Sequence, residues 1–245
     1  MIGGKMMENK NRKSELFSRE CELKYKIDLQ NKDKYMCRLI REGFEKVGCI
    51  VETDYTPDVE GFLCKKAGVM LRIRKIIGSQ NDLLVTLKVK RDNSCFQDND
   101  EIEFLASEFD QEIFDEINGI IFNCTGKKVP KEIIENKKMA EIICIMERNG
   151  FSVNRMFSQK KRDVYRKNGV KISFDTFPKD IGTYMEVETF SPEELIEFVT
   201  YMGYDQEKIE KRNYGKLIQD SQKDLNANDR RICVFEDKKE YFLNL

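Results

Sequence analysis

Apolar and charged residues alternate along several short stretches of the chain, and this pattern predicts β-strands. In the first stretch, Glu20, Glu22 and Lys24 alternate with Cys21 and Leu23. Successive side chains of a strand point to opposite faces, so the three charged side chains share one face. The same alternation recurs in residues 71–75, 83–90, 101–104, 160–166, 170–175 and 184–188. Each stretch is therefore predicted to be a strand with one charged face and one apolar face.

Like charges lie two residues apart on these strands, as in Arg72 and Arg74 or Glu186 and Glu188. A solvated surface strand is one interpretation of such a face, but like charges held close together repel each other. Basic strands that face acidic strands around a closed lumen would relieve this repulsion. We therefore expect the charges to point inward and the apolar faces to point outward, where helices must cover them.

Helical periodicity separates these strands. We expect helices at residues 33–47, 107–122, 131–149 and 206–217, and one that begins at Ser191-Pro192, where serine is the cap. Gly48 is expected to end the first helix, and residues 49–55 to form a strand. Residues 60–69 are expected to be a loop with a short strand. Asn168-Gly169 is the strongest hairpin signal in the chain.

The 245 residues fit one large domain, because strand and helix signals are interleaved along the whole chain. Residues 1–19 are polar and basic and are expected to be a disordered leader. Residues 20–220 would form the domain, and residues 221–245 a tail. Within the tail, residues 232–235 are β-like but have no predicted place in the fold.

Composition excludes several kinds of chemistry. The chain has no histidine, and its eight cysteines include no C-x-x-C pair, which argues against zinc sites and excludes histidine-based triads. A net charge of −1 argues against a broad nucleic-acid surface. Apolar runs do not approach the roughly 18 residues of a membrane span. We therefore expect a cytoplasmic protein with reduced thiols and no membrane or nucleic-acid partner.

The charged motifs occur in an order that resembles the CYTH superfamily, the triphosphate tunnel metalloenzymes. The motifs are Glu20-x-Glu22-x-Lys24, Leu71-Arg72-Ile73-Arg74, Thr86-Leu87-Lys88, Lys160-Lys161-Arg162, Asp175 and Gly182-x-Tyr184-x-Glu186-x-Glu188. The resemblance spans residues 20–217. It implies an α+β fold with a closed antiparallel barrel of about eight strands, a charged tunnel and helices packed outside.

The resemblance also implies roles for individual residues. Metal ligands would be Glu20, Glu22, Asp175, Glu186 and Glu188, with Glu103 as a possible assisting ligand. Substrate phosphates would be held by Lys24, Arg72, Arg74, Lys88, Lys90, Arg162 and Arg166. Magnesium or manganese suits ligands that are all oxygen. One family segment, Gln-x-Asp-x-Tyr, has only an altered counterpart in Glu52-Thr53-Asp54-Tyr55, to which the sequence assigns no role.

The expected activity is metal-dependent hydrolysis of inorganic triphosphate or of an organic compound that carries a triphosphate. With no histidine in the chain, the base would be a lysine whose pKa is lowered by neighbouring cations or a tunnel carboxylate, and Lys24 is the candidate. A class IV adenylate cyclase, which makes cyclic AMP and pyrophosphate from ATP, is the alternative enzyme. A non-catalytic module that binds polyphosphate or a nucleotide is the third possibility. The organic substituent and the oligomeric state stay open.

A few further side chains have two interpretations. Lys167, Lys171, Lys179 and Arg155 are expected to be solvated surface residues, and Tyr184 to be a wall residue. Lys211, Arg212 and Tyr214 would form either a lid on the tunnel or an ordinary amphipathic helix face.

Overall fold

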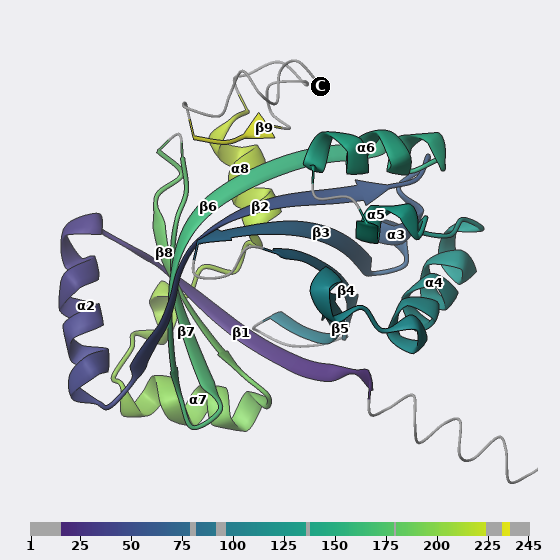
Figure 1. Ribbon diagram of the computed structural model, residues 1–245. Coiled ribbons are helices and arrows are strands. Elements are labelled where there is room, and N and C mark those ends of the chain that lie inside the picture. The colour runs from purple at the N-terminus through teal and green to yellow at the C-terminus, as the bar shows by residue number, and fades with distance from the viewer. Residues whose placement is uncertain are drawn as a thin grey trace, which may run out of the picture.

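The chain folds into a closed antiparallel β-barrel with helices packed around it (Figure 1). The computed structural model describes residues 16–78, 82–91, 97–135, 138–178, 180–223 and 232–235, with only the backbone of residues 154–156. Its strands are β1 (Ser18–Ile27), β2 (Glu45–Asp58), β3 (Val69–Gly78), β4 (Asp82–Lys90), β5 (Gln97–Leu105), β6 (Val153–Lys167), β7 (Val170–Thr176), β8 (Thr183–Thr189) and β9 (Ile232–Cys233). The predicted fold class is confirmed.

Eight of these strands form the barrel in the order β2, β3, β4, β5, β1, β8, β7, β6, and the pairing of β2 with β6 closes the ring. All the pairs within the ring are antiparallel. The short strand β9 lies parallel to β6 and extends the sheet. Residues 232 and 233 of the β-like stretch therefore pair with a strand of the barrel.

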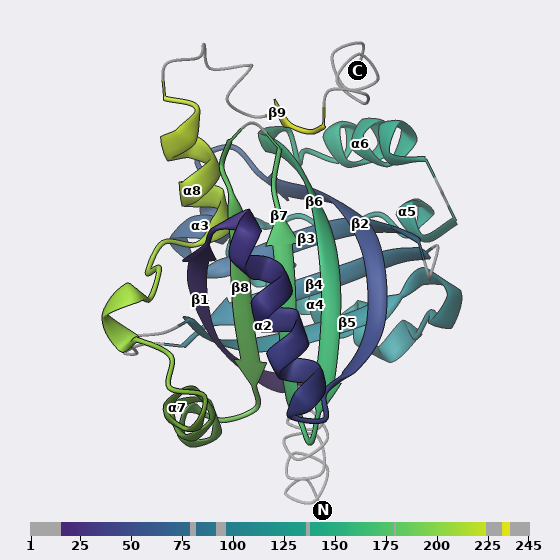
Figure 2. The same cartoon turned by 90° about the vertical axis from the view of Figure 1, so that its left-hand side faces the viewer.

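Helices cover the barrel on two sides (Figures 1 and 2). They are α2 (Leu29–Arg41), α3 (Leu63–Lys66), α4 (Gln111–Thr125), α5 (Glu132–Glu135), α6 (Met139–Arg148), α7 (Pro192–Tyr201) and α8 (Tyr214–Ser221), with 3-10 turns η1 (Ala106–Glu108) and η2 (Gln206–Lys208). Helices α3 to α6 pack against one group of strands, and α2 and α7 against β1, β7 and β8. Helix α8 packs on a third, smaller apolar cluster.

The apolar faces of the strands point outward into these helical layers. Ile73, Val85 and Leu87 are fully buried beneath α3 to α6, and Val187 is fully buried beneath α2 and α7. Complete burial of one such side chain contributes roughly 1.5–3 kcal/mol. Burial of this face fixes the phase of each strand, since a slip of one residue would turn its charged face outward.

Two predicted chain reversals are confirmed. Asn168 and Gly169 have φ angles of 47° and +81° and join β6 to β7, as a tight hairpin turn requires. Ser191 caps α7 through its hydroxyl, which accepts a hydrogen bond from the Glu194 amide at 3.1 Å, and Pro192 opens the helix.

The predicted helix at residues 33–47 was placed too far along the chain. Helix α2 ends at Arg41, and Gly43 with φ +81° turns the chain, so Gly48 does not end this helix. Val47 belongs to β2, which pairs with β6 almost throughout and has a register shift between Lys46 and Gly48. Pairing with a distant strand outweighs the local helical spacing here.

Other boundaries also differ from the prediction. Residues 60–69 include α3, which forms because the buried Asp58 carboxylate accepts hydrogen bonds from the amides of Val59, Cys64 and Lys65 at 2.7–3.1 Å. The stretch 131–149 contains two helices, α5 and α6, and α8 begins only at Tyr214. Strand β1 begins at Ser18, inside the predicted leader, whereas residues 1–15 lie outside the described residues.

Candidate functional site

Charged side chains fill the interior of the barrel. On β1, Glu20, Glu22 and Lys24 are 6%, 7% and 1% exposed, while Cys21 and Leu23 belong to the outer apolar core. The expectation of an inward charged face is therefore confirmed for this strand. Desolvated charges are costly unless they are paired, so the pairing of each one decides what the interior can bind.

The centre of the network is Arg162 on β6. Its guanidinium donates two hydrogen bonds of 2.6 Å to Asp175 on β7 and one of 2.9 Å to Glu186 on β8. Lys160 donates a further hydrogen bond to Asp175 at 3.0 Å. Burial alone would raise the pKa of the Asp175 carboxyl, but Arg162 and Lys160 outweigh it and hold that pKa well below its usual range. Asp175 is therefore a fixed anion.

A second group joins β2 to β3. Arg74 donates hydrogen bonds of 2.6 and 2.8 Å to Asp54 and contacts Glu52 at 2.9 Å. Glu52 also lies 3.3 Å from Lys160 and 3.7 Å from Arg162, so it bridges the two groups. The pKa of Asp54 is lowered because Arg74 outweighs the effect of burial. Three cations from β3 and β6 thus converge around these carboxylates.

A more acidic group lies between β1, β4 and β5. Lys88 contacts Glu20, and it lies 3.4 Å from Glu101, which is 3.5 Å from Arg72. Burial raises the pKa of Glu20 to about 7, because the neighbouring carboxylates Glu22 and Glu101 counteract the attraction of Lys88. Three carboxylates, Glu20, Glu22 and Glu101, thus lie close to Lys88 in this part of the interior.

Lys24 lies next to this group and donates a hydrogen bond of 2.8 Å to Glu22. Burial would lower the pKa of Lys24, but Glu22 and Glu186 outweigh it and raise that pKa. A general base requires the opposite direction, so the base role of Lys24 stays a prediction. As a buried cation, Lys24 suits phosphate binding.

Glu188 accepts a hydrogen bond from Lys171 at 2.6 Å, so Lys171 shares the tunnel face and is not the surface residue that the sequence indicated.

The structure brings most of the predicted site residues together. Those in the interior network are Glu20, Glu22, Lys24, Arg72, Arg74, Lys88, Arg162, Asp175, Glu186 and Glu188. Lys90, Glu103 and Arg166 are exposed. Glu103 nevertheless accepts a hydrogen bond from Thr86 at 3.2 Å, so it lies beside the network. Roles for these three residues rest on the resemblance alone.

Sequence reasoning missed several residues of the interior. Glu52, Asp54 and Glu101 contact the predicted phosphate-binding cations, and Lys160 contacts Asp175. The signal for Glu52 and Asp54 was present in the alternation of β2, but it was set aside because the spacing differed from the family segment. Glu101 lies in the acidic strand that the sequence identified, two residues from Glu103.

The carboxylates of the interior supply the oxygen ligands that a hard divalent cation prefers. Glu20, Glu22 and Glu188 are oxygen donors on adjacent strands, and the Glu101 Oε1 atom is buried without a hydrogen-bond partner. Within the described residues, however, no group of three or more such side chains is already arranged around one point as a metal centre. The five predicted ligands instead contact lysine or arginine, so metal binding would require these carboxylates to turn from their basic partners.

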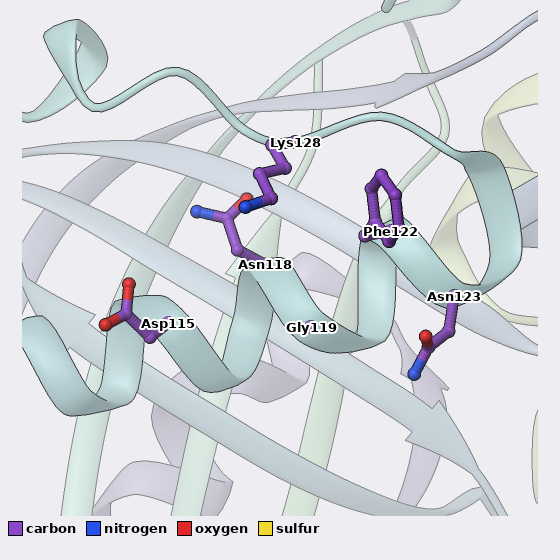
Figure 3. Close-up of a pocket in the computed structure, with 6 residues that line it drawn as sticks. All are labelled: Asp115, Asn118, Gly119, Phe122, Asn123 and Lys128. Atoms are coloured by element: carbon purple, nitrogen blue, oxygen red, sulfur yellow. The ribbon is translucent and has the colours of Figure 1, made fainter.

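A separate pocket lies on the outer face of α4 (Figure 3). Its lining residues are Asp115, Asn118, Gly119, Phe122, Asn123 and Lys128. The Asn118 amide is engaged by the following loop, since it accepts from the Val129 amide at 2.6 Å and donates to the Val129 carbonyl at 3.4 Å. This pocket contains none of the predicted site residues, most of which belong to the interior network.

Comparison with known proteins agrees with the geometry. The CYTH domain model matches residues 18–214. A conserved hypothetical protein of Pyrococcus furiosus is 22% identical, with a TM-score of 0.57 over 81% of this chain and 99% of that one. A Pyrococcus horikoshii protein is 19% identical, with a TM-score of 0.56 over 81% and 98%. None of the curated proteins matches.

In the described residues, no helix is both long and apolar enough to cross a membrane.

Proposed function

The chain belongs to the CYTH family, and on that basis we propose that it is a divalent-metal-dependent triphosphatase that hydrolyses inorganic triphosphate or an organic triphosphate. The proposal rests above all on one observation. Lys24, Arg74, Lys160 and Arg162 are buried at 1–6% exposure inside a closed barrel. Burial of charges costs free energy that ion pairs offset only in part, and a chain of phosphates would complement the cations of such a lumen.

The carboxylates of the interior favour catalysis over simple anion binding. A pocket that only binds phosphate needs donors and cations, whereas this interior also holds Glu20, Glu22 and Glu188 on neighbouring strands. We propose Glu20, Glu22, Asp175, Glu186 and Glu188 as the candidate ligands of Mg²⁺ or Mn²⁺, with Glu20 and Glu22 in the acidic part of the lumen. Such a cation would supply charge neutralisation at the phosphate oxygens.

The basic side chains would bind and orient the substrate. Arg74 and Arg162 present planar guanidinium groups, which suit two oxygens of one phosphate. To bind phosphate, Arg162 would exchange part of its contact with Asp175 or Glu186 for phosphate oxygens. Lys24 would hold a further oxygen and stabilise charge that develops during transfer. Arg72 and Lys88 would act in the same way from β3 and β4.

Hydrolysis needs a water molecule in line with the phosphorus, and cyclisation needs the ribose 3′-hydroxyl there instead. We favour hydrolysis because water needs no dedicated recognition pocket and the lumen contacts described above are made almost entirely by charged side chains. The test is to incubate the purified protein separately with tripolyphosphate and with ATP, each with Mg²⁺ or Mn²⁺, and to resolve the products. Orthophosphate and pyrophosphate from tripolyphosphate are expected.

Cyclic AMP and pyrophosphate from ATP, with tripolyphosphate left intact, would replace the triphosphatase by the cyclase. No product from either compound would favour the non-catalytic module. The variant Glu186→Gln, purified in the same way, is the control for contaminating phosphatases. Equal product from this variant would mean that the activity comes from a contaminant or does not depend on Glu186, and Glu22→Gln prepared in the same way separates the two: a contaminant would also persist unchanged in that preparation.

A further inference from the structure

Tyr214, the first residue of α8, lies at one end of the charged interior. The segment before it is fixed to β1, since the Glu210 amide donates to the Lys24 carbonyl at 2.7 Å and Ile209 forms a bridge with Tyr25. Asn213 then caps the helix by accepting a hydrogen bond from the Lys216 amide at 2.8 Å. These contacts fix the position of Tyr214 on the barrel.

The Tyr214 ring separates an apolar cluster from the charged network. On one side its centroid lies 4.7 Å from that of Phe177 and 5.8 Å from that of Tyr184. On the other side, the Nζ atoms of Lys24 and Lys160 each lie 4.9 Å from the ring centroid. The ring therefore covers two of the buried cations, which attract its π-face.

The hydroxyl group of Tyr214 is buried and has no hydrogen-bond partner. A phenol hydroxyl can donate one hydrogen bond, and the donor of Tyr214 is not used within the described residues. A buried hydroxyl without a partner is costly, and the contacts of the ring with Lys24 and Lys160 place this tyrosine beside the buried cations of the barrel.

We propose that Tyr214 is a substrate-binding residue whose hydroxyl donates a hydrogen bond to the phosphate group held by Lys24 and Lys160, with α8 closing this end of the tunnel. The proposal deepens the triphosphatase proposal and rests on it. It also favours the lid over the amphipathic-face interpretation of this helix. Arg212, which precedes the helix, pairs with Glu210 and with Asp220 of α8 on the surface, and so lies on the outside of the lid.

The test compares Tyr214→Phe with Tyr204→Phe. Tyr204 also has a buried hydroxyl without a partner, but it packs on Tyr25 and Phe198 outside the barrel. Each variant loses one oxygen and keeps its ring. Tripolyphosphate binding is measured by calorimetry, and kcat and KM are measured with Mg²⁺. Loss of a hydrogen bond to a charged phosphate should weaken binding by Tyr214→Phe roughly 10- to 100-fold, whereas Tyr204→Phe should bind like the wild type.

Equal binding by Tyr214→Phe and the wild type would overturn this inference and leave the triphosphatase proposal intact. If the wild type neither binds nor hydrolyses tripolyphosphate, the proposed function itself fails. Equal weakening in both tyrosine variants would indicate a general loss of packing and would also overturn the inference. If Tyr214→Phe does not fold, the near-ultraviolet difference spectrum of the wild type decides: tripolyphosphate should perturb tyrosine absorbance, and an unchanged spectrum contradicts the contact.

Discussion

Replacing Arg162 by methionine should strongly destabilise the protein, because it removes the charge that pairs three buried carboxylates. Arg162 contacts Asp175, Glu186 and Glu52 and is only 6% exposed. Removing one partner of a buried ion pair costs about 3–5 kcal/mol. For a chain of this size, 1 kcal/mol corresponds to roughly 2–4 °C in Tm, so Arg162→Met should lower Tm by roughly 6–20 °C at neutral pH.

The loss should depend on pH in a predictable direction. Asp175 has a lowered pKa in the folded protein, so its ionised form contributes stability that is present above the unfolded pKa, near 3.9, and is lost as pH falls. Arg162→Met removes the larger cause of this lowering, although Lys160 remains. The Tm difference between wild type and variant should therefore be largest and nearly constant around pH 7, and should shrink progressively as pH falls below about 4.

The matched control is Arg212→Met, which removes an arginine that pairs with Glu210 and Asp220 but is half-exposed. Exposed pairs contribute roughly 0–1 kcal/mol, so Tm should fall by less than about 4 °C. Differential scanning calorimetry at several pH values from about 2 to 8 measures both variants. An Arg162→Met shift as small as that of the control, or one that does not change with pH, would refute the argument that buried pairing stabilises the barrel.

Three further outcomes are expected. Glu22→Gln and Glu186→Gln should each lose at least about 100-fold of the metal-dependent activity while tripolyphosphate still raises Tm, and full turnover at saturating Mg²⁺ would remove them from the ligand set. Tripolyphosphate at 100 times its Kd should stabilise the wild type by about 2.7 kcal/mol, or roughly 5–11 °C, and no shift at millimolar ligand would argue against a tunnel site. Ile117→Ala, in the apolar core between the barrel and the helices, should lower the free energy of unfolding by roughly 2–5 kcal/mol without changing KM. A changed KM would contradict the separation of this apolar core from the charged interior.

The sequence predicted the barrel well because charged and apolar side chains alternate along its strands, so that the charged ones share one face. The end of α2 was missed because it depends on long-range pairing. The apolar residues after Arg41 follow helical spacing, yet Val47 lies in β2, which pairs with β6 along almost its whole length. The α3 turn was missed for another reason. It depends on the Asp58 carboxylate, which binds backbone amides up to seven residues away.

The candidate site was predictable in composition but not in pairing. The motifs identified Arg162 and Asp175 separately, and only the register of β6 against β7 shows that they face each other. Glu52 was set aside because it did not match a family segment, although its alternation placed it on the same face. Tyr214 could not be assigned from sequence, since its role depends on where a distant helix meets the barrel end.

A crystal structure of the protein with tripolyphosphate and Mn²⁺ tests the central claim most directly, since anomalous scattering locates the manganese. The anion should lie inside the barrel, with oxygens within about 3 Å of Arg74, Arg162 and Lys24, and the manganese should lie beside Glu22 and Glu188. Anion and manganese bound only outside the barrel, with the pairing of Arg162 and Asp175 unchanged, would contradict the account.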